Sequence, residues 1–167
     1  MKQERFEQFS RRNGKRVYNY ILRMIRNRED AEDITQEVFL AVYGKYDSIA
    51  PEARDSYLFR AAYNRAVNFA RRRGRDPEVQ QSETAEPSVE DTPQDTSDGR
   101  NDTIRAAMAR LNDNERAAVD MKYYQAMSYK DIADVLGISP AAVDSLLIRA
   151  RRKLKKIISQ DAKDSVV

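Results

Sequence analysis

The sequence predicts an all-α protein of two small helical domains joined by a flexible acidic linker. Apolar residues recur at helical spacing before residue 75 and again after residue 102. Glycine and proline each occur only five times in 167 residues, which favours helices. Residues 76–102 contain three of the five prolines and almost no large apolar side chain. Such a segment cannot bury enough surface to offset its ordering entropy, which predicts the linker.

The charge pattern divides the chain in the same way. Residues 1–75 carry 17 basic and 10 acidic side chains, and residues 76–102 carry 1 basic and 9 acidic ones. Two basic parts therefore flank an acidic segment. Two interpretations of this segment remain open: a passive, solvated tether, or a polyanionic chain that occupies a basic channel. We expect domains over residues 1–75 and 103–160, with a tail over 161–167.

Composition excludes several classes of function. The chain has no cysteine and no histidine, which rules out disulfides, thiolate metal sites and imidazole chemistry. We therefore expect no metal, no cofactor and no enzymatic activity. No apolar run approaches the roughly 20 residues of a membrane span, and the N-terminus lacks an apolar signal core. These features predict a cytoplasmic protein without membrane insertion.

The N-terminal domain is predicted to hold three or four helices. The apolar residues of the first are Phe6, Phe9, Val17, Tyr20, Ile21, Met24 and Ile25. A second helix is expected from about Glu29 to Tyr46, with Ile34, Val38 and Val42 buried and acidic residues in its first turn, which suit the helix dipole.

A third helix is expected over residues 56–75, after a loop that contains Pro51. Helical geometry places Tyr57, Arg60, Asn64 and Arg71 roughly along one face. Rings that stack on bases and guanidinium groups that pair with phosphates suit single-stranded nucleic acid. A solvated, arginine-rich helix end explains this pattern equally well.

Residues Ser128 to Lys156 predict a helix-turn-helix. Gly137 stands where the first helix must end, and Ser139 and Pro140 suit the N-cap and first position of the next helix. Val143, Leu146 and Leu147 are expected to pack against the first helix. The second helix ends in the basic residues Arg149, Arg151, Arg152, Lys153, Lys155 and Lys156. Two ordinary core helices would explain the apolar positions but not the uniformly basic end of the second helix. This basic end favours DNA binding.

These motifs together resemble the extracytoplasmic-function (ECF) group of bacterial sigma factors. DAEDITQEVFLAVYGKYD (Asp30 to Asp47) resembles the family's polymerase-binding helix. SYLFRAAYNRAVNFARRR resembles its promoter-melting helix, and the segment from Leu111 to Leu154 resembles its promoter-reading domain. The resemblance implies a transcription initiation factor that binds RNA polymerase core through the largest subunits and recognises promoter DNA.

The resemblance also assigns residues by position. The expected contacts with polymerase core are Asp33, Gln36, Glu37, Phe39 and Tyr43. The expected minus-ten contacts are Tyr57, Arg60, Asn64 and Arg71, with the loop from Lys45 to Asp55 forming a pocket for a flipped base. The expected minus-thirty-five contacts are Ser139, Asp144, Ser145, Arg149 and Arg151.

The recognition helix departs from the family pattern at three positions. Asp144, Leu146 and Ile148 replace residues that are often basic or polar in the family. An aspartate there repels phosphate or accepts a hydrogen bond from cytosine N4. Leu146 and Ile148 are expected to pack rather than to read bases. Tyr57 replaces the family's tryptophan and keeps a surface for stacking.

Two other classes of function fit parts of the sequence. A helix-turn-helix regulator that does not act as a sigma subunit would not need the acidic and aromatic N-terminal helices and would usually be dimeric. Asp30, Asp33 and Glu37 resemble carboxylate ligands of a metalloenzyme, but such bundles add histidines that this chain lacks. The resemblance further implies a chain that is monomeric when free and restrained by an anti-sigma factor.

Overall fold

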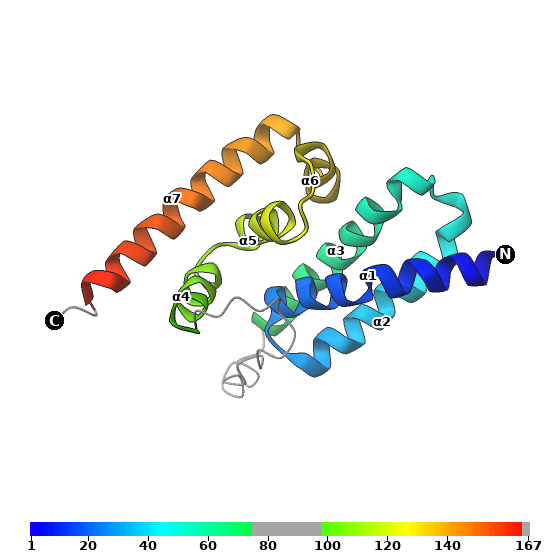
Figure 1. Ribbon diagram of the computed structural model, residues 1–167, viewed down its shortest axis with the longest axis horizontal. Coiled ribbons are helices and arrows are strands. Elements are labelled where there is room, and N and C mark those ends of the chain that lie inside the picture. The colour runs from blue at the N-terminus through cyan, green and yellow to red at the C-terminus, as the bar shows by residue number, and fades with distance from the viewer. Residues whose placement is uncertain (75–97, 165–167) are drawn as a thin grey trace. The chain divides into compact units, whose positions relative to one another are not determined.

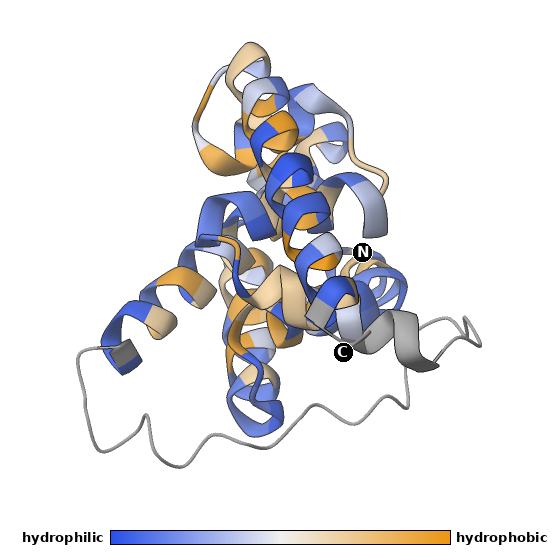
Figure 2. Ribbon diagram, turned by 90° about the vertical axis from the view of Figure 1, so that its left-hand side faces the viewer, coloured by the Kyte–Doolittle hydropathy of each residue, from blue (hydrophilic) through white to orange (hydrophobic). Residues whose placement is uncertain are grey.

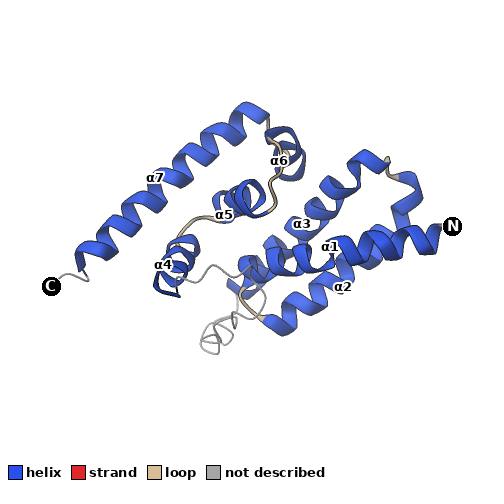
Figure 3. Ribbon diagram, viewed as in Figure 1, coloured by secondary structure: helices blue, strands red, loops and turns tan. Residues whose placement is uncertain are grey.

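The computed structural model describes residues 1–74 and 98–164, which are helical with short connections and contain no strand (Figure 3). The chain divides into two compact units, one ending at Glu90 and the next beginning at Asp91. Along the helices, hydrophobic and hydrophilic residues alternate (Figure 2), as expected when each helix buries one face. The all-α prediction is confirmed.

Within residues 1–74 of the N-terminal unit, three long helices pack against one another (Figure 1). They are α1 (Lys2–Ile25), α2 (Arg28–Lys45) and α3 (Arg54–Gly74). Two single turns of 3₁₀-helix, η1 (Tyr46–Ser48) and η2 (Pro51–Ala53), connect α2 to α3. The buried core is formed by Phe9, Val17, Tyr20, Ile21, Ala31, Ile34, Val38, Val42, Leu58, Phe59, Ala62 and Ala66.

The start of α2 follows from a polar cap. The Asn27 side chain accepts a hydrogen bond of 3.0 Å from the backbone N–H of Asp30, which satisfies a donor that the first turn leaves open. Because Asn27 is the cap, the helix begins at Arg28, one residue before the predicted start. Asp30 also pairs with Arg73 at 3.2 Å, which ties the beginning of α2 to the end of α3.

In the described residues of the C-terminal unit, 98–164, four α-helices surround a second core. They are α4 (Asp98–Ala109), α5 (Asp113–Val119), α6 (Tyr129–Leu136) and α7 (Pro140–Asp164). A π-helical turn, η3 (Asp120–Tyr124), follows α5 directly. The unit buries Met121, Ile132, Ala133, Val143, Leu147 and Ala150.

The helix-turn-helix forms as the sequence predicted. Gly137 ends α6 in the left-handed region with φ 69°, a conformation that costs glycine little. The Ser139 hydroxyl accepts a hydrogen bond of 3.1 Å from the N–H of Ala142, so it caps α7. Val143 and Leu147 are fully buried and hold α7 against α6.

Two helix boundaries differ from the expected domain limits. The helix α4 begins at Asp98, so the last five residues of the segment expected as a linker are helical. Residues 76–97 of that segment lie outside the described residues. At the other end α7 continues to Asp164, beyond the predicted end of the domain at 160.

Candidate protein and nucleic-acid interfaces

The outer face of α2 is polar and ends in one exposed apolar residue. Asp33, Gln36 and Glu37 are all exposed, as expected for residues that contact a partner. Leu40 follows on the same face and is 72% exposed, more than other large apolar side chains of α2. Leu40 is not among the residues predicted to contact core, although its position three residues after Glu37 indicates this face. We call Asp33, Gln36, Glu37 and Leu40 the α2 face.

Phe39 and Tyr43, which were also expected on this face, instead border an aromatic cluster. The ring of Phe6 lies 6.4 Å from that of Phe39 and 4.9 Å from that of Tyr43, both edge to face. Phe39 is half-buried there, whereas Tyr43 is 38% exposed and has the Lys2 ammonium 4.5 Å from its ring centroid. Phe39 thus has a structural role that the sequence did not reveal.

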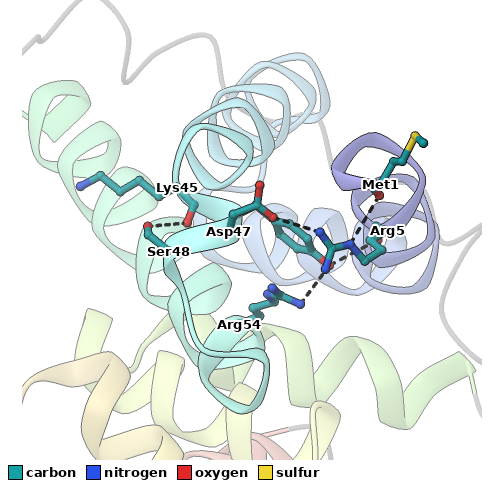
Figure 4. A network of polar contacts seen from close by, with 7 residues as sticks. Met1, Arg5, Lys45, Asp47, Ser48 and Arg54 are labelled. Carbon is teal, nitrogen blue, oxygen red and sulfur yellow. Dashed lines mark hydrogen bonds and ion pairs between the residues drawn. The ribbon is translucent and has the colours of Figure 1, made fainter.

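The loop between α2 and α3 is held in place by a polar network (Figure 4). The Arg54 guanidinium lies 3.9 Å from the ring centroid of Tyr46 and donates to its hydroxyl at 3.3 Å. The same hydroxyl donates to the carbonyl oxygen of Arg5 at 3.3 Å, and the Arg5 side chain pairs with Asp47 at 3.4 Å. These contacts fasten the segment expected to form the base pocket to α1.

One side of α3 carries the residues expected to meet the minus-ten element. At 100° per residue Tyr57, Arg60, Asn64 and Arg71 fall within an arc of about 60°. Arg60, Asn64 and Arg71 are exposed and Tyr57 is half-buried. Asn68, which is not among the predicted site residues, is also exposed and lies beside this stripe.

The recognition helix α7 presents the expected promoter-reading residues to solvent. Asp144, Ser145 and Arg149 are exposed, and Arg151 is exposed with its guanidinium 6.0 Å from the ring centroid of Tyr123. Ser139 is exposed too, but its hydroxyl is engaged as the helix cap.

Two side chains of α7 differ from their sequence-based interpretation. Leu146 is 7% exposed and packs, as expected, but Ile148 is 39% exposed, so the expectation that it packs is wrong. Its position four residues after exposed Asp144 turns it toward the same side. Lys153, assigned to the basic tail, instead pairs at 2.7 Å with the buried Glu115 of α5.

Each of the two units matches a family of known proteins. Residues 9–76 match the model of sigma-70 region 2, and residues 101–154 match that of sigma-70, region 4. The chain is 30% identical over 166 residues to the ECF RNA polymerase sigma factor SigE of Mycolicibacterium smegmatis, covering 96% of this chain and 64% of that relative. It is 30% identical over 128 residues to the RNA polymerase sigma-E factor of Streptomyces antibioticus, covering 76% of this chain and 69% of the relative.

The fold is also found in a solved structure. The sigma factor RpoE from Bartonella quintana, solved in complex with the anti-sigma factor NepR, matches with a TM-score of 0.75 at 24% identity. That match covers 93% of this chain and 98% of the other.

The chain belongs to the ECF group of the sigma-70 family. It is a transcription initiation factor that binds RNA polymerase and promoter DNA. Because both a region 2 and a region 4 are present, a plain helix-turn-helix regulator is not favoured. Within residues 1–74 and 98–164, no helix is both long and apolar enough to cross a membrane.

Proposed function

We propose that the α2 face binds RNA polymerase core, that α3 and its preceding loop capture the minus-ten element, and that α7 reads the minus-thirty-five element. The observation that carries this proposal is the α2 face itself, where Leu40 stands 72% exposed among exposed polar residues. An exposed apolar side chain ringed by polar ones is typical of an interface centre.

For the minus-ten element, the α3 stripe supplies both kinds of contact that an unpaired strand needs. In this proposal the exposed Arg60 and Arg71 pair with phosphates, and the exposed Asn64 hydrogen-bonds an extruded base. Half-buried Tyr57 offers part of its ring for stacking. The fastened loop before α3 supplies the walls of the base pocket.

The protein itself carries out no catalytic step in this proposal, since polymerase core supplies the chemistry. It acts in the cytoplasm, where promoter DNA and core are found, and it is monomeric until core binds it. An anti-sigma factor restrains the free chain by covering the surfaces that core and DNA require. This part of the proposal is supported by the sigma factor RpoE from Bartonella quintana, which was solved in complex with the anti-sigma factor NepR.

Co-purification with polymerase core tests the α2 face directly. Glu37→Lys combined with Leu40→Asp is expected to weaken core binding by at least about 2 kcal/mol, the scale of an interface hot spot. Phe39 is left intact because it packs against Phe6 and its loss would disturb the fold. Glu7→Lys makes the same charge change at an exposed residue of α1 and serves as the control. Undiminished binding of the double variant would contradict the proposal.

A further inference from the structure

The solvent-facing side of α7 carries an apolar residue at its centre. At 100° per residue Ile148 lies about 40° from Asp144 on one side and about 60° from Ser145 on the other. All three are exposed, and Ile148 is 39% exposed. Ala141, two turns earlier and also exposed, lies about 20° from Ile148 and adds little bulk. In the first turns of α7 the middle of this face is therefore apolar and its edges are polar. Exposed Arg152 and Lys155 follow one and two turns later, about 40° and 20° from Ile148.

Ile148 contributes little to the packing of α7. The packing of α7 is supplied by Val143, Leu147 and Ala150, which are fully buried on the opposite side. Truncation of Ile148 should thus leave the helix-turn-helix intact. An apolar side chain at the centre of a recognition helix meets base edges in the major groove, where thymine alone offers a methyl group.

Asp144 limits what can lie beside that methyl group. Its carboxylate is exposed and forms no ion pair within the described part of the chain. A free carboxylate repels phosphate but accepts a hydrogen bond from cytosine N4. Its position four residues before Ile148 places the two side chains about one helical turn apart, which lets them meet neighbouring base pairs.

From this geometry we infer that α7 reads a thymine through Ile148 and a nearby cytosine through Asp144 in the minus-thirty-five element. The inference rests on the proposed function, because it requires α7 to lie in the major groove. Asp144 and Ile148 both depart from the family pattern of the recognition helix, and both are exposed. The inference assigns the base preference to these two side chains.

Deoxyuridine substitution tests the thymine contact, since it removes only the methyl group. Holoenzyme from polymerase core and the full chain first selects its preferred sequence from DNA randomised across the minus-thirty-five segment. Each selected thymine is then replaced in turn. At one position wild-type binding should fall about fourfold, which corresponds to ~0.8 kcal/mol for one buried methyl group. The Ile148→Ala holoenzyme should show no fall at that position.

A matched control exists in the same unit. Ile104 of α4 is 40% exposed, almost the same as Ile148, and Ile104→Ala should respond to deoxyuridine as the wild type does. For the second contact, Asp144→Asn should change the preferred base from cytosine to adenine at one position, because an amide pairs with adenine N6 and N7.

The outcomes separate the inference from the proposed function. If wild-type holoenzyme selects no sequence in this segment, the proposed function fails and the inference falls with it. If it selects a sequence, but deoxyuridine has no effect or acts equally on Ile148→Ala, the inference alone is overturned. Loss of the thymine effect in Ile148→Ala, with Ile104→Ala unchanged, supports it.

Discussion

The guanidinium of Arg54 stacks 3.9 Å from the ring centroid of Tyr46 and donates a hydrogen bond to its hydroxyl. Tyr46 is 3% exposed and lies in the turn that follows α2, whereas Arg54 begins α3. The pair therefore closes the loop between these helices from both ends. The cation–π contact and the hydrogen bond together hold the eight-residue connection, with its two short 3₁₀ turns, against the start of α3.

Arg54→Lys should reduce promoter opening while core binding stays unchanged. Lysine keeps the charge but cannot stack as a planar group over the ring or reach the hydroxyl in the same geometry, which removes about 1 kcal/mol. Permanganate reactivity of exposed thymines measures the opening. Arg11→Lys, at an exposed arginine of α1, is the control. Equal promoter opening by Arg54→Lys and wild type would show that opening does not depend on the contact between Arg54 and Tyr46.

Asn64→Ala should abolish opening without affecting core binding. Asn64 is exposed on the α3 stripe, so its loss leaves the core intact and removes a hydrogen-bonding group for an unpaired base. Tyr57→Ala should lower opening as well, at roughly 1–3 kcal/mol for a lost base stack. The same permanganate assay applies. If Asn64→Ala opens promoters at the wild-type level, the base pocket lies elsewhere.

Arg149 and Arg151 should differ in what they do to DNA binding. Arg149 shares a face with Ser145, and its replacement by alanine should relax sequence preference by about 1–3 kcal/mol if it forms a bidentate guanine contact. Arg151 lies near Tyr123, so Arg151→Ala should weaken all sequences about equally and flatten the salt dependence by roughly one counterion. Binding across a promoter library and a salt series measures both effects. A change in preference from Arg151→Ala alone would reverse the assignment.

Lys153→Met should destabilise the C-terminal unit by about 2 kcal/mol. The Glu115 carboxylate is 3% exposed, and its Oε1 accepts from the Lys153 ammonium at 2.7 Å, so removing lysine leaves a buried charge unpaired. The estimate is below that for a fully buried pair because the lysine side chain is 53% exposed. Hydrogen exchange of the α5 and α7 amides reports the stability.

Adding Glu115→Gln to Lys153→Met is the control for this mechanism. The neutral amide has no charge to desolvate, so the double variant should regain part of the lost stability. Equal exchange rates in wild type and Lys153→Met would mean that the pair contributes nothing.

Local sequence signals were sufficient to predict much of the fold. Gly137, Ser139 and the buried Val143 act within one or two helical turns, so spacing alone locates the turn and the start of α7. The same holds for Ile34, Val38 and Val42, whose period predicts the buried side of α2.

Side chains whose position depends on another helix could not be predicted. Phe39 is half-buried because it packs against Phe6 of α1. Lys153 forms an ion pair instead of being a free basic side chain because the buried Glu115 of α5 lies within reach of its ammonium group. Ile148 is exposed because Val143 and Leu147 already fill the contact with α6. Ala126 adopts φ 53° after the π-helical turn, which no local pattern indicates.

Transcription in vitro tests the central claim most directly. Purified RNA polymerase core, the full chain and a pool of promoter fragments are combined, and run-off transcripts are measured with and without the chain. We predict transcripts with defined start sites that appear only when the chain is present and that are lost with Glu37→Lys combined with Leu40→Asp. Two results would contradict the account. Polymerase core could initiate transcription at the same sites without the chain, or the chain could bind promoter DNA alone without directing core to a start site.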